Sequence, residues 1–456
     1  MASSKRKVLP VFIIISTMLA GACGVTGGAS DPKSEGNKDP AAAAGAIDNI
    51  ALPKGTKIDF WHIQATIYGE AVSEITKQFN ATNEWGIIVN PVFKGSYVEL
   101  NQAIRAALAG GGAPDVAMAY ENDTLEYQRA GEIVELDPYL KSKKYGVTDE
   151  KLADLVPGVL ARQQIPAYGG HTLSWPHGNS AFGMYYNTDM LAKAGIDKPP
   201  STYDEFLADA RQFKKATGNS FTSLGLAQSS FYYNMLRSKG VTPYDPQGAT
   251  TKFASPESLA VLKMVATLYK EKLAYTVADG IATEAEFTNQ RAPIELGTTA
   301  RASTKIEQIG TKFKWGIAMS PSDAKPITQL FGGNHVILKS GGTDNEKLAA
   351  WLFMRYFADT TGQSVYASRT GYSPAVKSAL ETPLLKADFT KNPQKLQVFD
   401  KVFVNAQILP ATSAGNAINA LVDQAVEAVA EGKSTPEEAA KRMDAEGSSL
   451  LTAAKP

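Results

Sequence analysis

From residue 57 onward, short strand-like runs alternate with helix-like runs. Residues 57–61, 87–93 and 115–120 are rich in apolar or β-branched side chains and fit strands, whereas residues 71–79 and 100–108 place apolar side chains at helical spacing. This β-α-β-α-β order predicts an α/β fold with a mainly parallel sheet.

The same alternation returns further along the chain. Residues 182–186, 314–319 and 335–338 fit strands, and Thr202 with Glu205 has the spacing of a capping box at the start of a helix. The last quarter is mostly helical and ends in a helix that Thr435, Pro436 and Glu438 would begin. A length of 456 residues fits two or three domains, or one large two-lobed fold.

The composition excludes several function classes. Lys+Arg and Asp+Glu number 46 each, so nothing in the net charge suggests electrostatic capture of nucleic acid. Four histidines and one cysteine cannot build a Cys/His zinc cluster, and we expect no metal and no cofactor. We find no nucleophile elbow, no Walker A loop, no H-E-x-x-H and no EF-hand pattern, and we expect no catalytic residues.

The N-terminus predicts export. Residues 1–22 place Lys5, Arg6 and Lys7 before an apolar run, residues 8–20, that is shorter than the roughly 20 residues a membrane span needs. Small residues then precede Cys23, which resembles a bacterial lipobox with Ala20 where a larger aliphatic residue is usual. That resemblance implies lipidation of Cys23; a plain cleavable signal is the alternative.

Residues 23–55 are rich in small and polar residues and are predicted to form a flexible tether. No later run of about 18 apolar residues appears in the sequence, so we expect a soluble body. The N-terminal region therefore predicts a protein held by a lipid anchor at the outer face of the cell membrane.

Short motifs along the body carry a family resemblance. They are FWH at 60–62, VFKGSY at 92–97, AGGGAPDVAM at 109–118, YYNTDMLAKAGI at 185–196 followed by PPSTYDEF at 199–206, and TGYSPAV at 370–376. In this order the chain resembles the carbohydrate-type extracellular solute-binding proteins of ABC importers. It is similar to glycerol-3-phosphate and glycerophosphodiester binders in particular, and somewhat less to maltose and other sugar binders.

The resemblance implies a periplasmic-binding-protein-like clamshell of two α/β lobes joined by a multi-segment hinge. Residues 56–177 and 332–374 would form the N-terminal lobe, and residues 178–331 and 375–456 the C-terminal lobe. The chain would cross near residues 175–178, 331–333 and 373–376. Ligand would lie between the lobes, outside the strand ends, and the lobes would close around it.

One departure bears on the ligand. In the glycerol-3-phosphate binder an arginine at the start of the penultimate helix holds the phosphate, and Ser413 stands at that position here. Residues 64–66 likewise replace a Glu-containing segment of that relative. Losing a guanidinium removes the bidentate contact that a phosphate prefers, so we expect a neutral sugar or oligosaccharide. Arg301 and His177 keep a phosphodiester open as an alternative.

Side chains expected at strand ends or crossings are the ligand-binding candidates, and Glu121 matches the relatives' ligand-contacting carboxylate. The candidates are Trp61, His62, Gln64, Tyr97, Glu121, Asp123, Trp175, His177, Asn179, Tyr232, Tyr233, Thr298, Arg301, Gly333, Asn334, Tyr372, Ser413 and Asn416.

The expected partners are a sugar or polyol and the permease subunits of an ABC transporter, with the protein acting as a monomer. A secreted glycoside hydrolase is the rival from another class, because one sequence cannot show which carboxylates pair. A solute sensor that signals to a membrane receptor would share the cleft and differ only in its partner.

Overall fold

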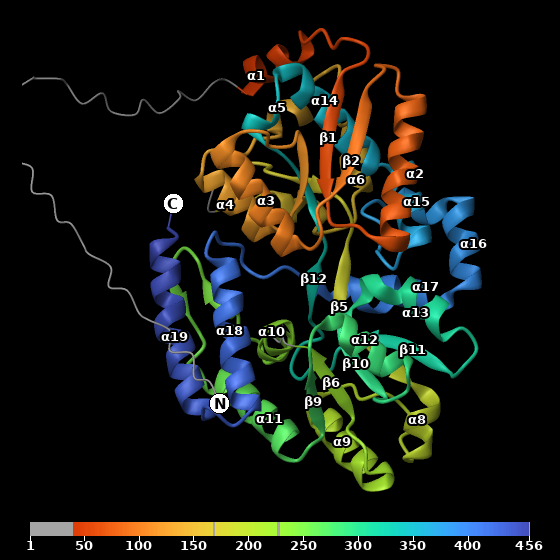
Figure 1. Ribbon diagram of the computed structural model, residues 1–456, viewed down its shortest axis with the longest axis vertical. Helices are drawn as coiled ribbons and strands as arrows, with labels where there is room; N and C mark the ends of the chain where they lie inside the picture. The colour runs from red at the N-terminus through yellow and green to blue at the C-terminus, as the bar shows by residue number, and fades with distance from the viewer. Residues whose placement is uncertain (1–39, 167–168, 226–228, 456) are drawn as a thin grey trace, which may run out of the picture. The chain divides into compact units, whose positions relative to one another are not determined.

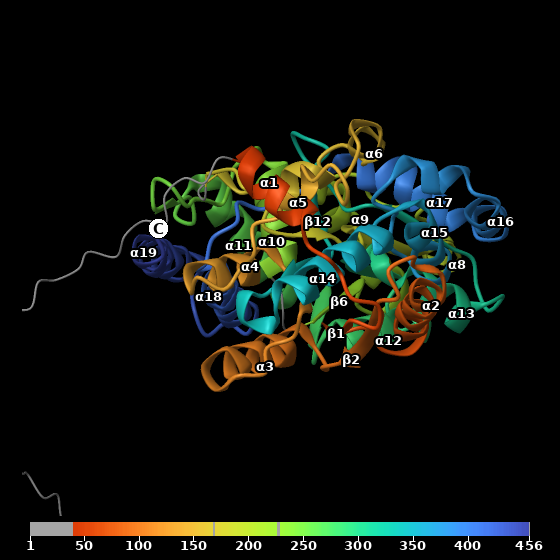
Figure 2. The same cartoon turned by 90° about the horizontal axis from the view of Figure 1, so that it is seen from above.

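A computed structural model describes residues 40–166, 169–225 and 229–455. The expected signal peptide, residues 1–22, and the expected lipidation site, Cys23, lie outside the described residues. Within the described part, two lobes are each built around a sheet with its own core (Figures 1 and 2).

The sheet of the first lobe has the order β2-β1-β3-β13-β4. Its strands are β1 (Lys57–His62), β2 (Ile88–Phe93), β3 (Val116–Ala119), β4 (Trp175–Pro176) and β13 (Asn334–Ile337). β1 pairs in parallel with both β2 and β3, whereas β13 runs antiparallel to β3 and β4. Alternate residues of β1, ending with Phe60 and His62, point into the core, which is the period-2 pattern of a half-buried strand.

The helices of the first lobe supply the other side of its core. Those that pack on the sheet and on one another include α2 (Thr66–Thr82), α3 (Tyr97–Gly110), α4 (Glu121–Arg129), α14 (Asp344–Phe357) and α15 (Thr360–Arg369). The shorter helices are α1 (Pro40–Asp48), α5 (Asp137–Leu140), α6 (Asp149–Asp154), α7 (Val159–Gln163) and α16 (Pro383–Lys391).

The sheet of the second lobe has the order β14-β12-β5-β10-β6-β9, with β11 also pairing β5. Its strands are β5 (Ser180–Asn187), β6 (Thr222–Gly225), β9 (Ala274–Val277), β10 (Ile294–Thr298), β11 (Trp315–Met319), β12 (Thr328–Phe331) and β14 (Ala406–Gln407). A separate hairpin joins β7 (Tyr244–Asp245) and β8 (Thr250–Thr251). The strands expected at residues 182–186 and 314–319 are therefore confirmed.

The helices of the second lobe pack against this sheet and against one another, and most of them bury an apolar stripe. They are α8 (Thr188–Lys193), α9 (Tyr203–Thr217), α10 (Ser229–Ser238), α11 (Pro256–Lys270), α12 (Gly280–Thr288), α13 (Ala302–Ile309), α17 (Pro393–Gln397), α18 (Gly415–Ala430) and α19 (Pro436–Ala453). The last helix begins at the expected capping box, in which Thr435 and Glu438 satisfy each other's backbone N–H groups.

Three connections join the lobes. The chain passes from β4 to β5 and later returns from β12 to β13. The third connection differs, because residues 375–391, expected in the second lobe, pack on the first. Ala375 and Val376 belong to the first core, and the Ala375 carbonyl accepts from the Val156 N–H at 2.9 Å. Only with α17, which contacts β11 and α13, does the chain join the second lobe.

Two further local expectations were wrong. Residues 40–55 are not tether: Ala44 is buried, and the Asp48 carboxylate accepts from the Lys144 N–H at 2.9 Å. The run of alanines, which suggested a linker, is also the strongest helix former. At the start of α9, Thr202 caps the Glu205 N–H, but the Glu205 carboxylate accepts from the Ser201 N–H, so the capping box is only half formed.

Candidate functional site

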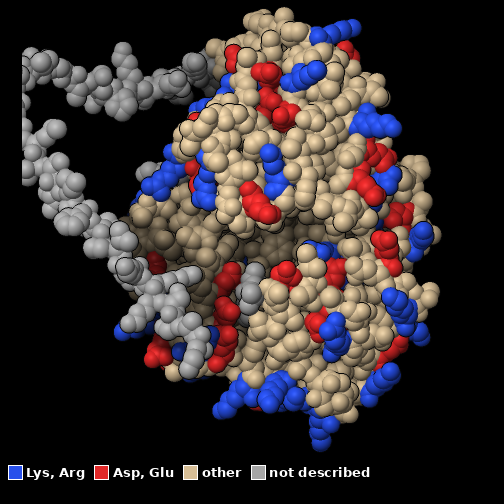
Figure 3. Space-filling view, viewed as in Figure 1, with Lys and Arg blue, Asp and Glu red and all other residues tan. Residues whose placement is uncertain are grey.

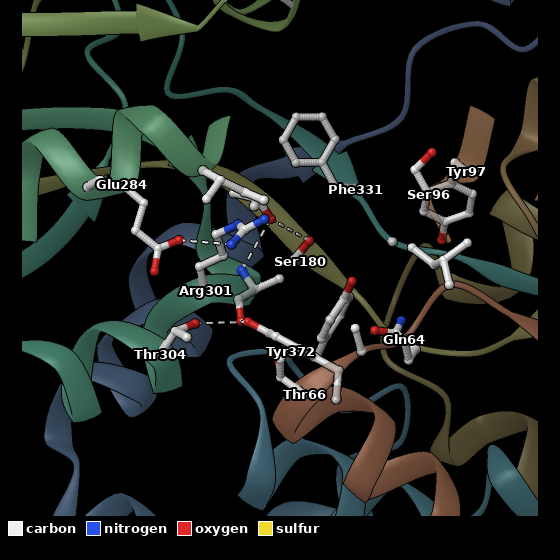
Figure 4. Close-up of a pocket in the computed structure, with 18 of the residues that line it drawn as sticks. Gln64, Thr66, Ser96, Tyr97, Ser180, Glu284, Arg301, Thr304, Phe331 and Tyr372 are labelled. Atoms are coloured by element: carbon white, nitrogen blue, oxygen red, sulfur yellow. Dashed lines mark hydrogen bonds and ion pairs between the residues drawn. The ribbon is translucent and has the colours of Figure 1, made fainter. Parts of the chain in front are cut away.

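A cavity of about 1110 Å³ lies between the two lobes (Figures 3 and 4). From the first lobe it is lined by residues that follow β1, β2 and β3, and from the second by residues of β5, β10, β12, α12 and α13. The carboxyl ends of parallel strands meet at one edge of a sheet, which is where α/β folds place ligands.

Two tyrosines form an aromatic surface on the first-lobe side. Tyr97 and Tyr120 are stacked with ring centroids 3.9 Å apart. Tyr97 is held at the start of α3 by a capping box of Ser96 and Glu99. Burial raises the pKa of Tyr97 well above its usual value, and among the described residues its buried hydroxyl has no hydrogen-bond partner. The aromatic surface suits a ligand that is apolar on one face.

Gln64 follows β1 and presents an amide to the cavity. The backbone N–H of Gln64 donates to His62 Nδ1 at 3.2 Å, and the side-chain Nε2 of Gln64 lies 3.4 Å from His177 Nε2. Gln64 is 5% exposed, so its amide is held by its neighbours rather than by solvent. Tyr372, near the third connection, lines the cavity beside it (Figure 4).

The second-lobe wall contains a buried group of charges. Arg301 Nη1 donates to Glu284 Oε2 at 3.0 Å, and both side chains line the cavity. Behind them, Lys305 Nζ lies 2.9 Å from Glu295 Oε1 and 3.7 Å from Glu284 Oε2. Lys305 is fully buried, and its ammonium lies 4.0 Å from the centre of the Tyr185 ring. Two cations therefore face two carboxylates within this group.

A buried arginine ties together the connections between the lobes. Arg162 of α7 donates to the Glu121 carboxylate and to the Gly332 carbonyl, and its Nη1 lies 3.1 Å from Asn179 Oδ1. Asn334 Nδ2 donates to the same Glu121 oxygen at 3.1 Å. Glu121 is thus held by an ion pair behind the cavity.

Direct contacts also cross from lobe to lobe. Asp123 of α4 accepts from Asn416 Nδ2 of α18 at 2.8 Å, and burial raises the pKa of this aspartate. On another side, the Tyr68 hydroxyl donates to the Ala300 carbonyl at 3.1 Å. Both contacts must change if the lobes move apart.

Comparison with known proteins identifies the family. The family model for bacterial extracellular solute-binding proteins matches residues 74–395, which is more than half of the chain. The chain belongs to this family.

Individual relatives agree with this identification. This solute-binding protein is 26% identical over 415 residues to the sn-glycerol-3-phosphate-binding periplasmic protein UgpB of Escherichia coli K12, over 87% of this chain and 92% of that one. It superposes on the GacH receptor of Streptomyces glaucescens with a TM-score of 0.76 at 20% identity, over 89% and 100% of the two chains. UgpB from Mycobacterium tuberculosis matches with a TM-score of 0.76 at 18% identity, over 88% and 99%. The two-lobed fold expected from the sequence is thereby confirmed.

The structure brings a subset of the expected ligand-binding residues to the cavity of this solute-binding protein. Those that line it are Gln64, Tyr97, Thr298, Arg301 and Tyr372. Asn179, Gly333, Asn334 and Glu121 lie just behind, in the network around Arg162 or against Tyr97. That any of these side chains contacts a ligand stays a prediction.

Other expected residues lie elsewhere. Tyr232 and Tyr233 are fully buried in the core of the second lobe, and Trp175 packs edge-to-face on Trp351 in the first core. The Lys94 ammonium lies over the Trp61 ring, 3.6 Å from the centre of that ring.

The remaining expected residues make internal contacts. His62 and His177 are buried among aromatic rings, Asp123 and Asn416 bond to each other, and Ser413 Oγ donates to the Ala454 carbonyl at 3.4 Å. None of these side chains is among the described residues that line the cavity.

Sequence reasoning missed three contributors. Glu284 comes from the middle of α12, Arg162 from a short helix, and Tyr68 from the first turn of α2. Glu284 and Arg162 are charged residues that are nearly inaccessible, and burial cannot be read from one sequence.

The structure offers no sign of a metal site or a membrane span in the part of the chain that it describes. There, no group of three or more His, Cys, Asp or Glu side chains is arranged to hold a metal ion. Nor does any helix among those residues have the length and hydropathy to cross a bilayer.

Proposed function

We propose that this solute-binding protein captures a neutral sugar or oligosaccharide in the cavity between its lobes and delivers it to the permease of an ABC importer. The observation that carries the proposal is the chemistry of the cavity wall. Stacked tyrosines offer flat apolar area, and Gln64 and Thr298 offer hydrogen bonds. A volume of about 1110 Å³ is ample for a ligand of oligosaccharide size.

The balance of charge favours a neutral ligand. Two cations of the wall, the half-buried Arg301 and the buried Lys305, already face Glu284 and Glu295. A phosphate would have to compete with those carboxylates, which hydrogen-bond and neutralise the same cations. Lys312 at the rim is exposed and donates to a backbone carbonyl.

Relatives bind ligands of both kinds. GacH was solved in complex with acarbose, and a protein from Arthrobacter globiformis is named for binding cyclic α-maltosyl-1,6-maltose. UgpB of Mycobacterium tuberculosis was solved with glycerophosphocholine. A glycerophosphodiester is therefore the second candidate, and the specific observation in its favour is that Arg301 lines the cavity.

A binding role without chemistry fits the cavity better than glycoside hydrolysis. Retaining and inverting glycosidases both use two carboxyl groups flanking the scissile bond, about 5–9.5 Å apart. Among the described residues that line the cavity, Glu284 is the sole carboxylate, and it is paired with Arg301. Hydrolysis of an oligosaccharide by the purified protein would contradict this part of the proposal.

A thermal-shift screen tests the ligand class. At a hundredfold excess over Kd, a true ligand adds about 2.7 kcal/mol of stability. We expect maltotriose or another neutral oligosaccharide to raise the melting temperature, and sn-glycerol 3-phosphate and glycerophosphocholine to leave it unchanged. A shift with only the phosphorylated compounds would overturn the neutral-sugar proposal.

Arg301→Gln sharpens the screen. If the ligand is neutral, this variant should lose no more than one hydrogen bond, about 1 kcal/mol. Loss of all phosphodiester binding would instead identify Arg301 as an anion ligand. Arg211→Gln is the matched control, because Arg211 pairs with Glu271 on the exposed surface of the same lobe.

We also propose that residues 1–22 are removed and that Cys23 is lipidated, which would hold the body at the outer face of the membrane. The support is the basic and apolar pattern of residues 1–22 and the position of the single cysteine. Cys23→Ser should move the expressed protein from the membrane fraction to the medium. Retention of that variant in the membrane would contradict lipid anchoring.

A further inference from the structure

Helix α4 of the first lobe contacts the second lobe at the start of α18 and at the end of α19 (Figure 1). α18 and α19 pack on each other, so these two helix ends lie close together. We call this contact the α4 interface. Its α4 residues are Asn122, Asp123 and Arg129, and none of them is among the described residues that line the cavity.

At the α4 interface, a carboxylate that its own lobe already holds receives a donor from the other lobe. Asp123 is 5% exposed and accepts from Asn101 Nδ2 at 2.9 Å and from the Tyr120 N–H at 3.1 Å, both in the first lobe. From the second lobe, Asn416 Nδ2 of α18 donates to it at 2.8 Å. Because the carboxylate is fixed beforehand, little conformational entropy is lost when Asn416 reaches it.

Next to this pair, the backbones of the two lobes come close at a glycine. Asn122 Oδ1 accepts from the Thr412 N–H at 3.3 Å, just before α18. Gly415, the first residue of α18, is buried against the Asn122 side chain, and a Cβ at position 415 would overlap the Asn122 amide. Even an alanine therefore does not fit at position 415 while α4 and α18 are in contact.

At its other end, α4 caps a helix of the second lobe. Arg129, the last residue of α4, donates from Nη2 to the carbonyl of Ala453 at 2.9 Å, and Ala453 is the last residue of α19. The last carbonyls of a helix have no partner within the helix and carry partial negative charge, so a guanidinium there is favourable.

The α4 interface lies apart from the connections between the lobes. In Figures 1 and 2, α4 and α18 lie to one side of β12, which leads into the second connection. A rotation of one lobe at the connections would therefore separate α4 from α18. Water could then bond to the freed polar groups, so each contact favours the closed arrangement by a small amount only.

We propose that the α4 interface favours the closed arrangement of the lobes and thereby sets the affinity for every ligand, although its residues touch none. A smaller closed fraction raises Kd by the same factor for each ligand. Asp123 and Asn416, which the sequence predicts to contact the ligand, would then act on binding through closure. The inference rests on the proposed ligand site between the lobes.

The distance between two spin labels tests the interface without any ligand. Cys23→Ser removes the single native cysteine, and Ser73→Cys on α2 with Glu307→Cys on α13 places one label on each lobe, both at exposed positions. Alanine is a better helix former than glycine, so Gly415→Ala disturbs the contact and not the helix. We expect it to raise the ratio of long to short interlobe distances about tenfold. An unchanged distribution would overturn the proposal.

Two further variants show whether the added methyl group acts through Asn122. Gly280→Ala is the matched control, because Gly280 also begins a second-lobe helix and a Cβ there would meet nothing within 4 Å. It should leave the distances unchanged. Asn122→Ala makes room for the methyl group, so the double variant Asn122→Ala/Gly415→Ala should return to within about twofold of Asn122→Ala alone. If the second substitution gave no such rescue, the steric explanation would be wrong.

Asn416→Ala and Arg129→Gln apply the same distance test if Gly415→Ala does not fold, because both side chains are exposed outside their contacts. Each loses one hydrogen bond between the lobes, and we expect the ratio of long to short distances to rise about fivefold. Arg211→Gln, which breaks an ion pair within the second lobe, is the control for Arg129→Gln. Distances unchanged in both interface variants would overturn the proposal.

Binding provides the second readout, with maltose, maltotriose and sn-glycerol 3-phosphate as probes in titration calorimetry. We expect Asn416→Ala to weaken each probe that binds the wild type by the same factor, about fivefold. Unchanged affinity, or factors that differ more than about threefold between probes, would contradict an effect through closure. If no probe binds the wild type, the proposed ligand fails, and the interlobe distances still decide the role of the α4 interface.

Discussion

The two walls of the cavity are built on opposite electrostatic principles. Behind the first-lobe wall, His177, His335 and Tyr366 form a buried network without net charge. Behind the second-lobe wall, Lys305 is buried between two carboxylates. A neutral network orients a dipole at little desolvation cost, whereas buried ions remain stable only while each has its partner. The first wall therefore depends on hydrogen-bond direction and the second on charge balance.

The largest effect should come from breaking the charge balance. Lys305→Met would leave Glu295 buried without its cation, and we expect the free energy of unfolding to fall by about 3–5 kcal/mol. Urea denaturation measures this loss. Lys263→Met is the matched control, since Lys263 pairs with Glu437 at an exposed site and should change stability by less than about 1 kcal/mol. If both variants lost the same free energy of unfolding, the second-lobe wall would not depend on charge balance as proposed.

Acid should destabilise the first wall. The pKa of His335 is lowered by burial to about 3, whereas in the unfolded chain it is about 6.5. Below pH 6.5 the unfolded state therefore binds a proton at His335 that the folded state does not bind. The contribution of His335 to the free energy of unfolding is complete above pH 6.5 and is lost as the pH falls below that value. The loss for this residue is about 2 kcal/mol by pH 5.

His335→Phe isolates this contribution. Urea midpoints at pH 7 and pH 5 should converge in the variant relative to the wild type. The variant must be compared with the wild type because Asp115 has the opposite effect on the pH dependence of stability. Burial raises the pKa of Asp115 to about 6, and its contribution to stability is lost as the pH rises through that value. An unchanged pH dependence in the variant would mean that His335 is not held neutral.

Giving the second-lobe wall a net positive charge should change which ligand it binds. Glu284→Gln removes one carboxylate from beside Arg301 and Lys305 and leaves a net positive wall. We expect the variant to bind sn-glycerol 3-phosphate about tenfold more tightly than the wild type does, as measured by titration calorimetry. Glu271→Gln, at an exposed ion pair of the same lobe, should have no such effect. No gain in anion binding would argue against charge balance as the basis of selectivity.

The smallest effect should distinguish a hydroxyl without a hydrogen-bond partner in the protein from a hydroxyl that has one. Tyr97→Phe removes a buried hydroxyl that no described residue contacts, so the ligand-free protein should be as stable as wild type or slightly more so. Affinity for a bound sugar should stay the same, because this hydroxyl is not accessible from the cavity. Thr298→Val removes a hydroxyl that is 3.1 Å from Ser180 Oγ and should lower stability by about 1 kcal/mol. A destabilised Tyr97→Phe would show that its hydroxyl has a structural partner.

Local pattern predicted much of the fold. β1, β3, β5 and β13 lie within about two residues of where alternation and β-branched runs place them, because strand formation follows the period of the side chains. The strand-end rule also located Gln64 and Tyr97. Predictions failed where long-range packing decides: Tyr232 and Tyr233 looked like cleft aromatics but lie in the core, and residues 40–55 looked like a linker but pack on the first lobe.

The sequence by itself determined the family, the alternation of strands and helices and the strand ends at which ligand groups gather, since all of these depend on neighbouring residues. Only the tertiary structure decided that Glu121 is committed to Arg162, that Arg301 is balanced by Glu284, and that His177 faces both Gln64 and His335. These partners are 17 to 158 residues apart in the chain. Charge and hydrogen-bond direction depend on what lies within a few ångströms in space, and the order of residues does not encode that directly.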